Sequence, residues 1–198
     1  MSNNPALPQM MEATDSELML RLAAGQDLAL NELMNRWRDR VATFLFRMTG
    51  HAETAADLAQ ETFVKLYQAR SRYRPEGKFS TYLFGIAANL GRNHARWKMR
   101  HPTVFLDETT DGVPVLRELF DSGQTPDEAA CTVERLHAIH RAFQGLASDL
   151  RETMSLFIHE NMGYAEIASV VGSSPKAVET RIYRARQILK EQLKNIRS

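Results

Sequence analysis

Two basic segments of the sequence carry residue types that bind nucleic acid. Residues 65–101 contain nine basic residues and one acidic residue, Glu76, which gives a net charge of +8. Residues 176–198 contain seven basic and two acidic residues, a net charge of +5. The whole chain of 198 residues carries only +1, so its positive charge is concentrated. Two basic segments separated by an acidic stretch indicate two contacts with a polyanion, more than they indicate two solvated helix faces.

The first basic segment also contains aromatic and amide side chains, a combination that suits single-stranded nucleic acid. Each base stacked on an aromatic ring contributes about 1–3 kcal/mol, and amides can pair with base edges. The candidates are the aromatic residues Phe79, Tyr82 and Trp97, the amides Asn89 and Asn93, and the cations Arg74, Lys78, Arg92, Arg96 and Arg100. The alternative is that the aromatic residues pack in a core while the arginines are solvated. For Trp97 the sequence favours neither.

The second basic segment has the features of the recognition helix of a helix-turn-helix. Ser174 is a candidate N-cap, and Pro175 follows at the first helical position. Apolar residues then recur in steps of three and four from Val178 to Ile196, which leaves the basic residues on the other sides. The first turns of such a helix enter the major groove. Side chains suited to bases or phosphates are Ser173, Ser174, Lys176, Thr180, Arg181 and Arg184. A purely structural helical corner is the alternative.

The sequence has no recognisable catalytic or metal-binding set, so we expect a protein without enzymatic activity or cofactor. It has no Gly-rich phosphate loop, and its six histidines and one cysteine are scattered. Asp57 and Glu61 share a helix face and are interpreted as a contact for a basic partner rather than as a two-metal site. With no secretory signal and no apolar run approaching the ~20 residues of a membrane span, we expect a cytoplasmic protein that is not inserted in a membrane.

The elements that position these residues are predicted to be helices throughout, because apolar residues recur at helical spacing and no alternating strand pattern is sustained. The predicted fold is all-α, with two small helical domains joined by a flexible linker. We expect a disordered tail at 1–13, a first domain at 14–101, an acidic linker at 102–124 and a second domain at 125–198. Leu83, Phe84, Ile86, Ala87 and Leu90 are the predicted packing side of a helix over about 81–100.

Two long stretches resemble bacterial extracytoplasmic-function (ECF) RNA polymerase sigma factors. The stretch "ADLAQETFVKLYQARSRYRPEGKFSTYLFGIAANLGRNHARWKMR" resembles their second conserved region, and "GYAEIASVVGSSPKAVETRIYRARQILKE" resembles their fourth. The resemblance implies a region 2 helical bundle, a region 4 helix-turn-helix and a role as the promoter-specificity subunit of RNA polymerase. It also implies an anti-sigma partner, and we expect a monomer when the chain is free.

The resemblance assigns three groups of site residues. Core polymerase would contact Asp57, Leu58, Gln60, Glu61 and Phe63. A second group would recognise and melt the promoter −10 element: Arg72, Tyr73, Arg74, Lys78, Phe79, Tyr82, Asn89, Arg92, Asn93, Arg96, Trp97 and Arg100. The −35 duplex would contact Ser173, Ser174, Lys176, Glu179, Thr180, Arg181 and Arg184.

The sequence departs from the family pattern at three positions. Glu179 stands where a basic residue is frequent, which puts a phosphate contact there in doubt, although Glu can accept from cytosine N4. Gly85 also replaces a common basic residue, and Tyr82 replaces a common Trp. Two other functions stay open: a stand-alone helix-turn-helix regulator with an N-terminal sensing or dimerisation domain, and a nucleic-acid enzyme, which would need a catalytic set that the sequence does not show.

Overall fold

The computed structural model of the chain describes residues 13–101 and 137–194, and every regular element in these residues is helical, as predicted. The elements are α1 (Asp15–Ala23), α2 (Leu28–Thr49), α3 (Ala52–Gln68), a short 3-10 helix η1 (Arg70–Arg72), α4 (Phe79–Arg100), α7 (Ser148–Ile158), α8 (Tyr164–Val171) and α9 (Pro175–Gln192). Residues 137–144 are also helical. The predicted tail (apart from residue 13), the acidic linker, residues 125–136 of the predicted second domain and its last residues, 195–198, lie outside the described residues.

Local sequence signals set several helix ends. Gly50 and Gly172 end α2 and α8 with φ of 79° and 65°, a left-handed conformation that glycine adopts without steric cost. The Ser174 hydroxyl accepts a hydrogen bond from the backbone N–H of Ala177 (3.2 Å), and Pro175 occupies the first turn of α9. The cap predicted at Ser174 is therefore confirmed.

The first domain packs α2, α3 and α4 around an aromatic core. Phe44 and Phe84 are fully buried, and their rings meet edge to face with centroids 5.2 Å apart. Trp37 contacts the same Phe84 ring at 6.1 Å. Gly91 allows α4 to lie close to α2, because a Cβ there would stand 3.0 Å from the Cε of Met48. The predicted packing side of α4 is confirmed for Leu83, Phe84, Ala87 and Leu90, which are buried, while Ile86 is half-buried.

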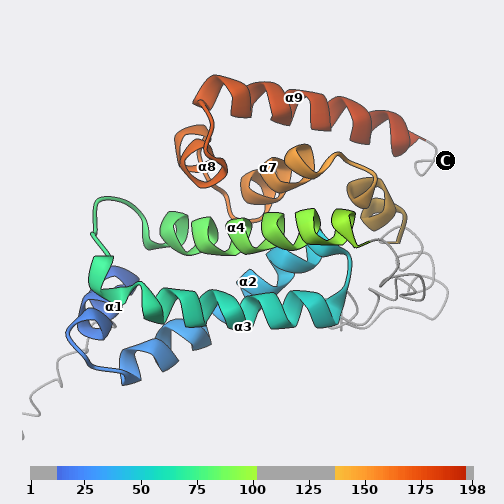
Figure 1. Ribbon diagram of the computed structural model, residues 1–198. Coiled ribbons are helices and arrows are strands. Elements are labelled where there is room, and N and C mark those ends of the chain that lie inside the picture. Colours follow the sequence, from blue (N-terminus) through green and yellow to red (C-terminus); the bar gives the residue numbers. More distant parts are fainter. Residues whose placement is uncertain (1–12, 102–136, 195–198) are drawn as a thin grey trace, which may run out of the picture.

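The second domain consists of the 137–144 helix and α7, α8 and α9, and it packs directly on the first. Figure 1 shows α4 between α2 and α3 on one side and α7, α8 and α9 on the other. Helix α4 contacts α8, and α2 contacts α7. The ring of Phe46 stacks on His140 at 5.3 Å. The side chains of Gln144 and Arg151 donate to the carbonyls of Arg47 and Met48, at 3.0 and 3.1 Å, near the end of α2.

Candidate nucleic-acid interface

A groove of about 1150 Å³ runs between α3, the 72–78 loop and α4. Eight of the twelve residues predicted for the −10 element line it: Arg72, Tyr73, Arg74, Lys78, Tyr82, Asn89, Arg92 and Asn93. Ser169 and Val170 of α8 also line it, so the second domain forms part of its wall. The groove combines cations, amides and an aromatic ring, which are the groups that hold single-stranded nucleic acid.

Two aromatic residues predicted to contact DNA instead lie in the core. Tyr73 and Phe79 are each only 4% exposed, and their rings meet edge to face at 6.4 Å. Phe79 is the first residue of α4 and also contacts Trp37 at 5.8 Å, while the Tyr73 hydroxyl donates to Ser16 Oγ (3.2 Å). The expectation of surface contacts by these side chains is corrected: they fix the loop between them to α1 and α2.

Tyr82 is the aromatic side chain that the groove keeps accessible. It is half-buried, and its ring lies 5.2 Å from that of Tyr73 at an edge-to-face angle. Burial raises the pKa of the Tyr82 hydroxyl, which therefore stays protonated and can donate a hydrogen bond.

The polar face of α4 carries the predicted amides and cations. Asn89, Asn93 and Arg96 are exposed, and Arg96 Nη2 donates to Asn93 Oδ1. Arg92 is half-buried and donates to Glu152 of the second domain. The face therefore exists as predicted, but Arg92 is engaged inside the protein.

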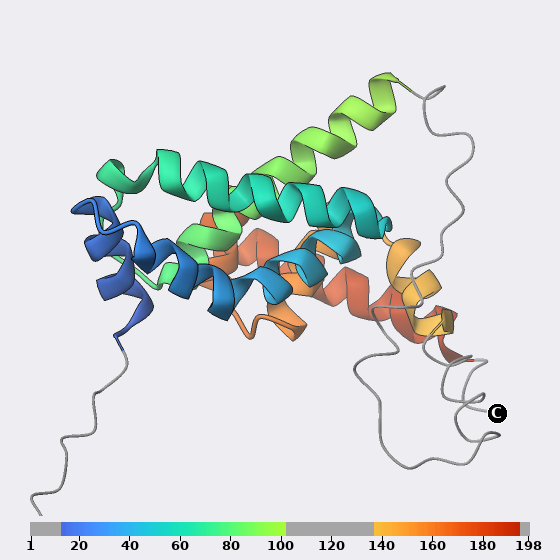
Figure 2. The same ribbon diagram turned by 90° about the horizontal axis from the view of Figure 1, so that it is seen from below.

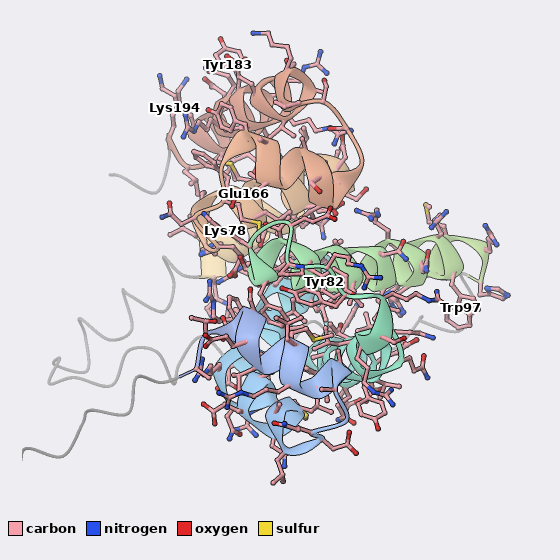
Figure 3. The ribbon with its side chains drawn as sticks, turned by 90° about the vertical axis from the view of Figure 1, so that its left-hand side faces the viewer. Lys78, Tyr82, Trp97, Glu166, Tyr183 and Lys194 are labelled. Atoms are coloured by element: carbon pink, nitrogen blue, oxygen red, sulfur yellow. The ribbon has the colours of Figure 1, made fainter. Side chains whose placement is uncertain are left out.

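Trp97 does not pack in the core. It is 44% exposed, and its ring stacks on His101 with centroids 4.7 Å apart. Figure 2 shows the end of α4 projecting past the neighbouring helices, and Figure 3 shows Trp97 at that end, far from Lys78 and Tyr82. Arg100 is exposed on the same projecting turns. These two residues, with Arg96, lie outside the groove.

The residues of α3 that were predicted to contact core polymerase fall into two sets. Asp57, Gln60 and Glu61 are exposed, whereas Leu58 and Phe63 are buried among the helices. The expectation that Leu58 and Phe63 make surface contacts is therefore corrected to a packing role. Val64, which sequence reasoning missed, is 51% exposed at helical spacing from Gln60 and Glu61. The exposure of Val64 could have been predicted from the sequence. Val64 directly follows the core residue Phe63, and adjacent residues of a helix point in different directions.

Helices α8 and α9 form the predicted helix-turn-helix. Val178, Ile182 and Ala185 bury one face of α9. Ser174, Lys176, Glu179, Thr180 and Arg184 are exposed on the other sides, while Ser173 and Arg181 are half-buried.

Several of the predicted −35 contacts are paired within the protein. Lys176 Nζ bonds Glu179 (2.8 Å), which raises the pKa of Lys176, and Arg181 Nε lies 3.4 Å from Asp149 of α7. Tyr183 was not predicted as a −35 contact, although its side chain is 64% exposed on α9, next to Arg184 in the sequence (Figure 3).

Among the residues that the structure describes, three ion pairs join the two domains. Their members are Arg40–Glu160 (2.8 Å), Lys78–Glu166 (2.9 Å) and Arg92–Glu152 (2.5 Å). Burial raises the pKa of Glu152 to about 6, because desolvation outweighs the attraction of Arg92. The pKa of Glu166 is instead lowered, chiefly by its hydrogen bond from Lys78 and then by the N–H of Gly163. Figure 3 shows Lys78 and Glu166 facing each other.

Within the described ranges, no helix is long and apolar enough to cross a bilayer. The same residues contain no group of three or more His, Cys, Asp or Glu side chains placed to hold a metal ion.

Comparison with known proteins identifies both domains. Residues 33–101 match Sigma-70 region 2, and residues 136–189 match Sigma-70, region 4. The RNA polymerase sigma-H factor of Pseudomonas aeruginosa is 29% identical over 184 residues, covering 90% of this chain and 93% of the relative. The ECF RNA polymerase sigma factor SigW of Bacillus subtilis is 26% identical, covering 94% of this chain and 100% of the relative.

Two solved structures share the fold. CnrH, in complex with the cytosolic domain of CnrY, has a TM-score of 0.66 and 25% identity over 90% of this chain and 96% of its own. RpoE of Bartonella quintana, in complex with the anti-sigma factor NepR, has a TM-score of 0.66 and 20% identity over 83% and 96%. An all-helical chain with these two regions in this order is a sigma-70-type transcription factor. The chain belongs to the ECF RNA polymerase sigma factors.

Proposed function

We propose that this sigma factor directs core RNA polymerase to promoters by holding the melted −10 strand in the groove of its first domain and reading the −35 duplex with α9. The observation that carries this proposal is the groove, which gathers seven accessible residues predicted to contact DNA, from α4 and from the segment that precedes it. We place the first domain at residues 14–101 and the second at 125–198. The chain acts in the cytoplasm as a binding subunit, not as a catalyst.

The groove suits an unstacked strand better than a duplex. Unstacking DNA costs a few kcal/mol per step, which stacking and hydrogen bonding to extruded bases must offset. Tyr82 offers a half-buried ring, Asn89 an exposed amide, and Arg72 and Arg74 exposed cations for phosphates. Trp97, outside the groove, offers a second exposed ring further along the strand.

Core polymerase docks on the exposed face of α3. Asp57, Gln60 and Glu61 present two carboxylates and an amide, and Val64 adds an apolar contact beside them. This combination fits a basic partner surface with an apolar centre. Leu58 and Phe63 support the face from within.

Helix α9 is suited to the major groove because its first turns are open. Lys176, Thr180 and Arg184 are exposed there, and the N–H groups at the helix start favour a phosphate. Glu179 can accept from cytosine N4 once it leaves Lys176.

The two DNA contacts can be separated by three variants in polymerase reconstituted with the full chain. Arg184→Ala should weaken binding to a duplex promoter fragment and leave binding to core polymerase unchanged. Asn89→Ala and Trp97→Ala should reduce promoter opening, measured by permanganate reactivity of unpaired thymines, more than they reduce recruitment. The control is Arg38→Ala, because that side chain is exposed on α2 and pairs with its sequence neighbour Asp39. Equal loss of promoter opening and of recruitment in the Asn89 and Trp97 variants would count against separate roles for the groove in opening and for α9 in duplex binding.

An anti-sigma partner remains part of the proposal. CnrH, the relative at 25% identity, was solved in complex with the cytosolic domain of CnrY. Co-purification of the chain with an inhibitory protein that blocks binding to core polymerase would support such a partner.

A further inference from the structure

Helix α7 presents two carboxylates to an arginine of α9. Arg181 Nε lies 3.4 Å from Asp149 Oδ2. Burial raises the pKa of Glu152, and the charge of Arg181 is among those that oppose this rise. Asp149 and Glu152 are three residues apart and so lie on the same side of α7. Glu152 accepts a hydrogen bond from Arg92, whereas Asp149 belongs to the first turn of α7 and its side chain is 53% exposed.

The exposed carboxylate of Asp149 lies beside the face of α9 that is proposed to bind the duplex. Arg181 directly follows Thr180 and lies one helical turn before Arg184, and both of these side chains are exposed. A carboxylate at the edge of such a face repels phosphates, so it weakens binding to DNA unless it acts through a neighbouring cation. Arg181 is the cation that Asp149 contacts.

The chemistry of arginine allows one side chain to bind two anions at once. The planar guanidinium group carries N–H donors along more than one edge, and the pair with Asp149 engages the Nε side. The Nη groups at the end of the side chain can then donate to a phosphate, in the geometry that guanidinium groups favour. The side chain of Arg181 is 29% exposed, which leaves it accessible at the edge of α9.

The Asp149–Arg181 pair contributes little to holding α7 and α9 together. These two helices pack against each other (Figure 1), and Val178, Ile182 and Ala185 bury one face of α9. An ion pair with a half-exposed partner adds little to this packing, because water screens its attraction. The pair instead fixes the direction of the Arg181 side chain, whose rotamers would otherwise be restricted only when DNA binds, at a cost in affinity.

We propose that Asp149 is a positioning residue for the −35 duplex: it holds Arg181 by Nε, so that the Nη groups of Arg181 meet a phosphate beside the major groove. This inference rests on the proposed function, in which α9 reads the duplex, and it adds a residue of α7 to that contact. Phosphate contacts do not depend on base sequence, so a duplex of mixed sequence is a sufficient probe.

Asp149→Asn is the variant that tests this role most sharply. It removes a negative charge, which by itself would strengthen binding to any DNA. Binding is measured by fluorescence anisotropy of the full chain with a short labelled duplex of mixed sequence. Arg181→Ala should weaken binding about tenfold, the effect of losing a hydrogen bond to a charged group, and Asp149→Asn about threefold, since it disorders the contact without removing it. The matched control, Glu191→Gln, makes the same charge change at an exposed carboxylate of α9 that pairs with Lys194, and it should not weaken binding.

A double-mutant cycle separates positioning from a merely structural role. In the Arg181→Ala background, Asp149→Asn should no longer weaken binding. It should also have no effect in the Arg181→Lys background, because an ammonium group lacks the fork that joins two anions. In the chain that keeps Arg181, Asp149→Asn should make binding less dependent on salt, by up to ~0.9 in the slope of log affinity against log salt for one phosphate. Equal losses with and without the Arg181 side chain, or an unchanged salt slope, would overturn the proposal.

The Arg184→Ala variant tests the proposed function in the same assay. Weaker binding by Arg184→Ala, together with undiminished binding by Asp149→Asn, would overturn the positioning role of Asp149 alone. If neither Arg184→Ala nor Arg181→Ala weakens binding, α9 is not the part of the chain that reads the duplex, and the proposed function fails together with this inference.

Discussion

Acidification should favour, through Glu152, the arrangement in which the two domains are packed together (the closed chain) over one in which they separate (the open chain). In the closed chain burial raises the pKa of this carboxyl to about 6, whereas exposure on opening returns it to the ordinary value of 4.5. Between these values the closed chain binds a proton that the open chain lacks. Closure is therefore favoured as the pH falls through 6, with the full effect below 4.5, and the effect is lost as the pH rises. The difference between 6 and 4.5 corresponds to about 2 kcal/mol, or ~30-fold in the closing equilibrium.

The assay must isolate Glu152 from other groups that titrate at the same interface. Burial lowers the pKa of His140, so its protonation opposes closure. Arg92, Arg181 and Asp149 also act electrostatically on Glu152.

The Glu152→Gln variant is neutral at every pH and keeps the other groups. Closure can be measured by energy transfer between dyes on cysteines at the exposed positions Glu53 of α3 and Gln187 of α9, in full-length chains that carry Cys131→Ser. Energy transfer in the wild-type and Glu152→Gln chains should diverge between pH 7.5 and 5, with the closing equilibrium of the wild type gaining about eightfold over that of the variant. An identical pH dependence in both chains would refute the reasoning.

Two further predictions concern the first domain. Phe79→Ala should lower the free energy of unfolding by roughly 3–5 kcal/mol, because the buried ring leaves a cavity; an unchanged melting temperature with lost promoter opening would contradict the core assignment. Gly85→Ala should stabilise α4 by about 1 kcal/mol in a denaturant titration, since nothing lies within 4 Å of its Cβ. Gly91→Ala should gain less, because its Cβ would crowd Met48, and equal gains would show that this contact relaxes freely.

The helices and their ends were predictable because they depend on neighbours in sequence. Ser174 and Gly50 are cap residues by local chemistry, and the spacing of Val178, Ile182 and Ala185 alone indicates the buried side of α9. The exposed amide of Asn89 was predicted for the same reason, since it lies off the apolar side of α4.

What the sequence could not decide depends on contacts between distant residues. An aromatic side chain suits a base platform and a core equally, so only the contact with Trp37 shows that Phe79 is buried. The glycines of α4 look alike in sequence, yet of the two discussed above only Gly91 faces a close neighbour. The engagement of Arg92 joins positions sixty residues apart and rests on the packing of two domains.

The central claim is that this chain makes core RNA polymerase specific for a promoter. The most direct measurement is to combine the purified full chain with core polymerase and genomic promoter fragments, and to detect unpaired thymines in the bound DNA. The account predicts that polymerase with the chain opens a defined set of promoters that neither component opens alone. Tight binding of the chain to palindromic DNA, without binding to core polymerase, would contradict it and favour a stand-alone regulator.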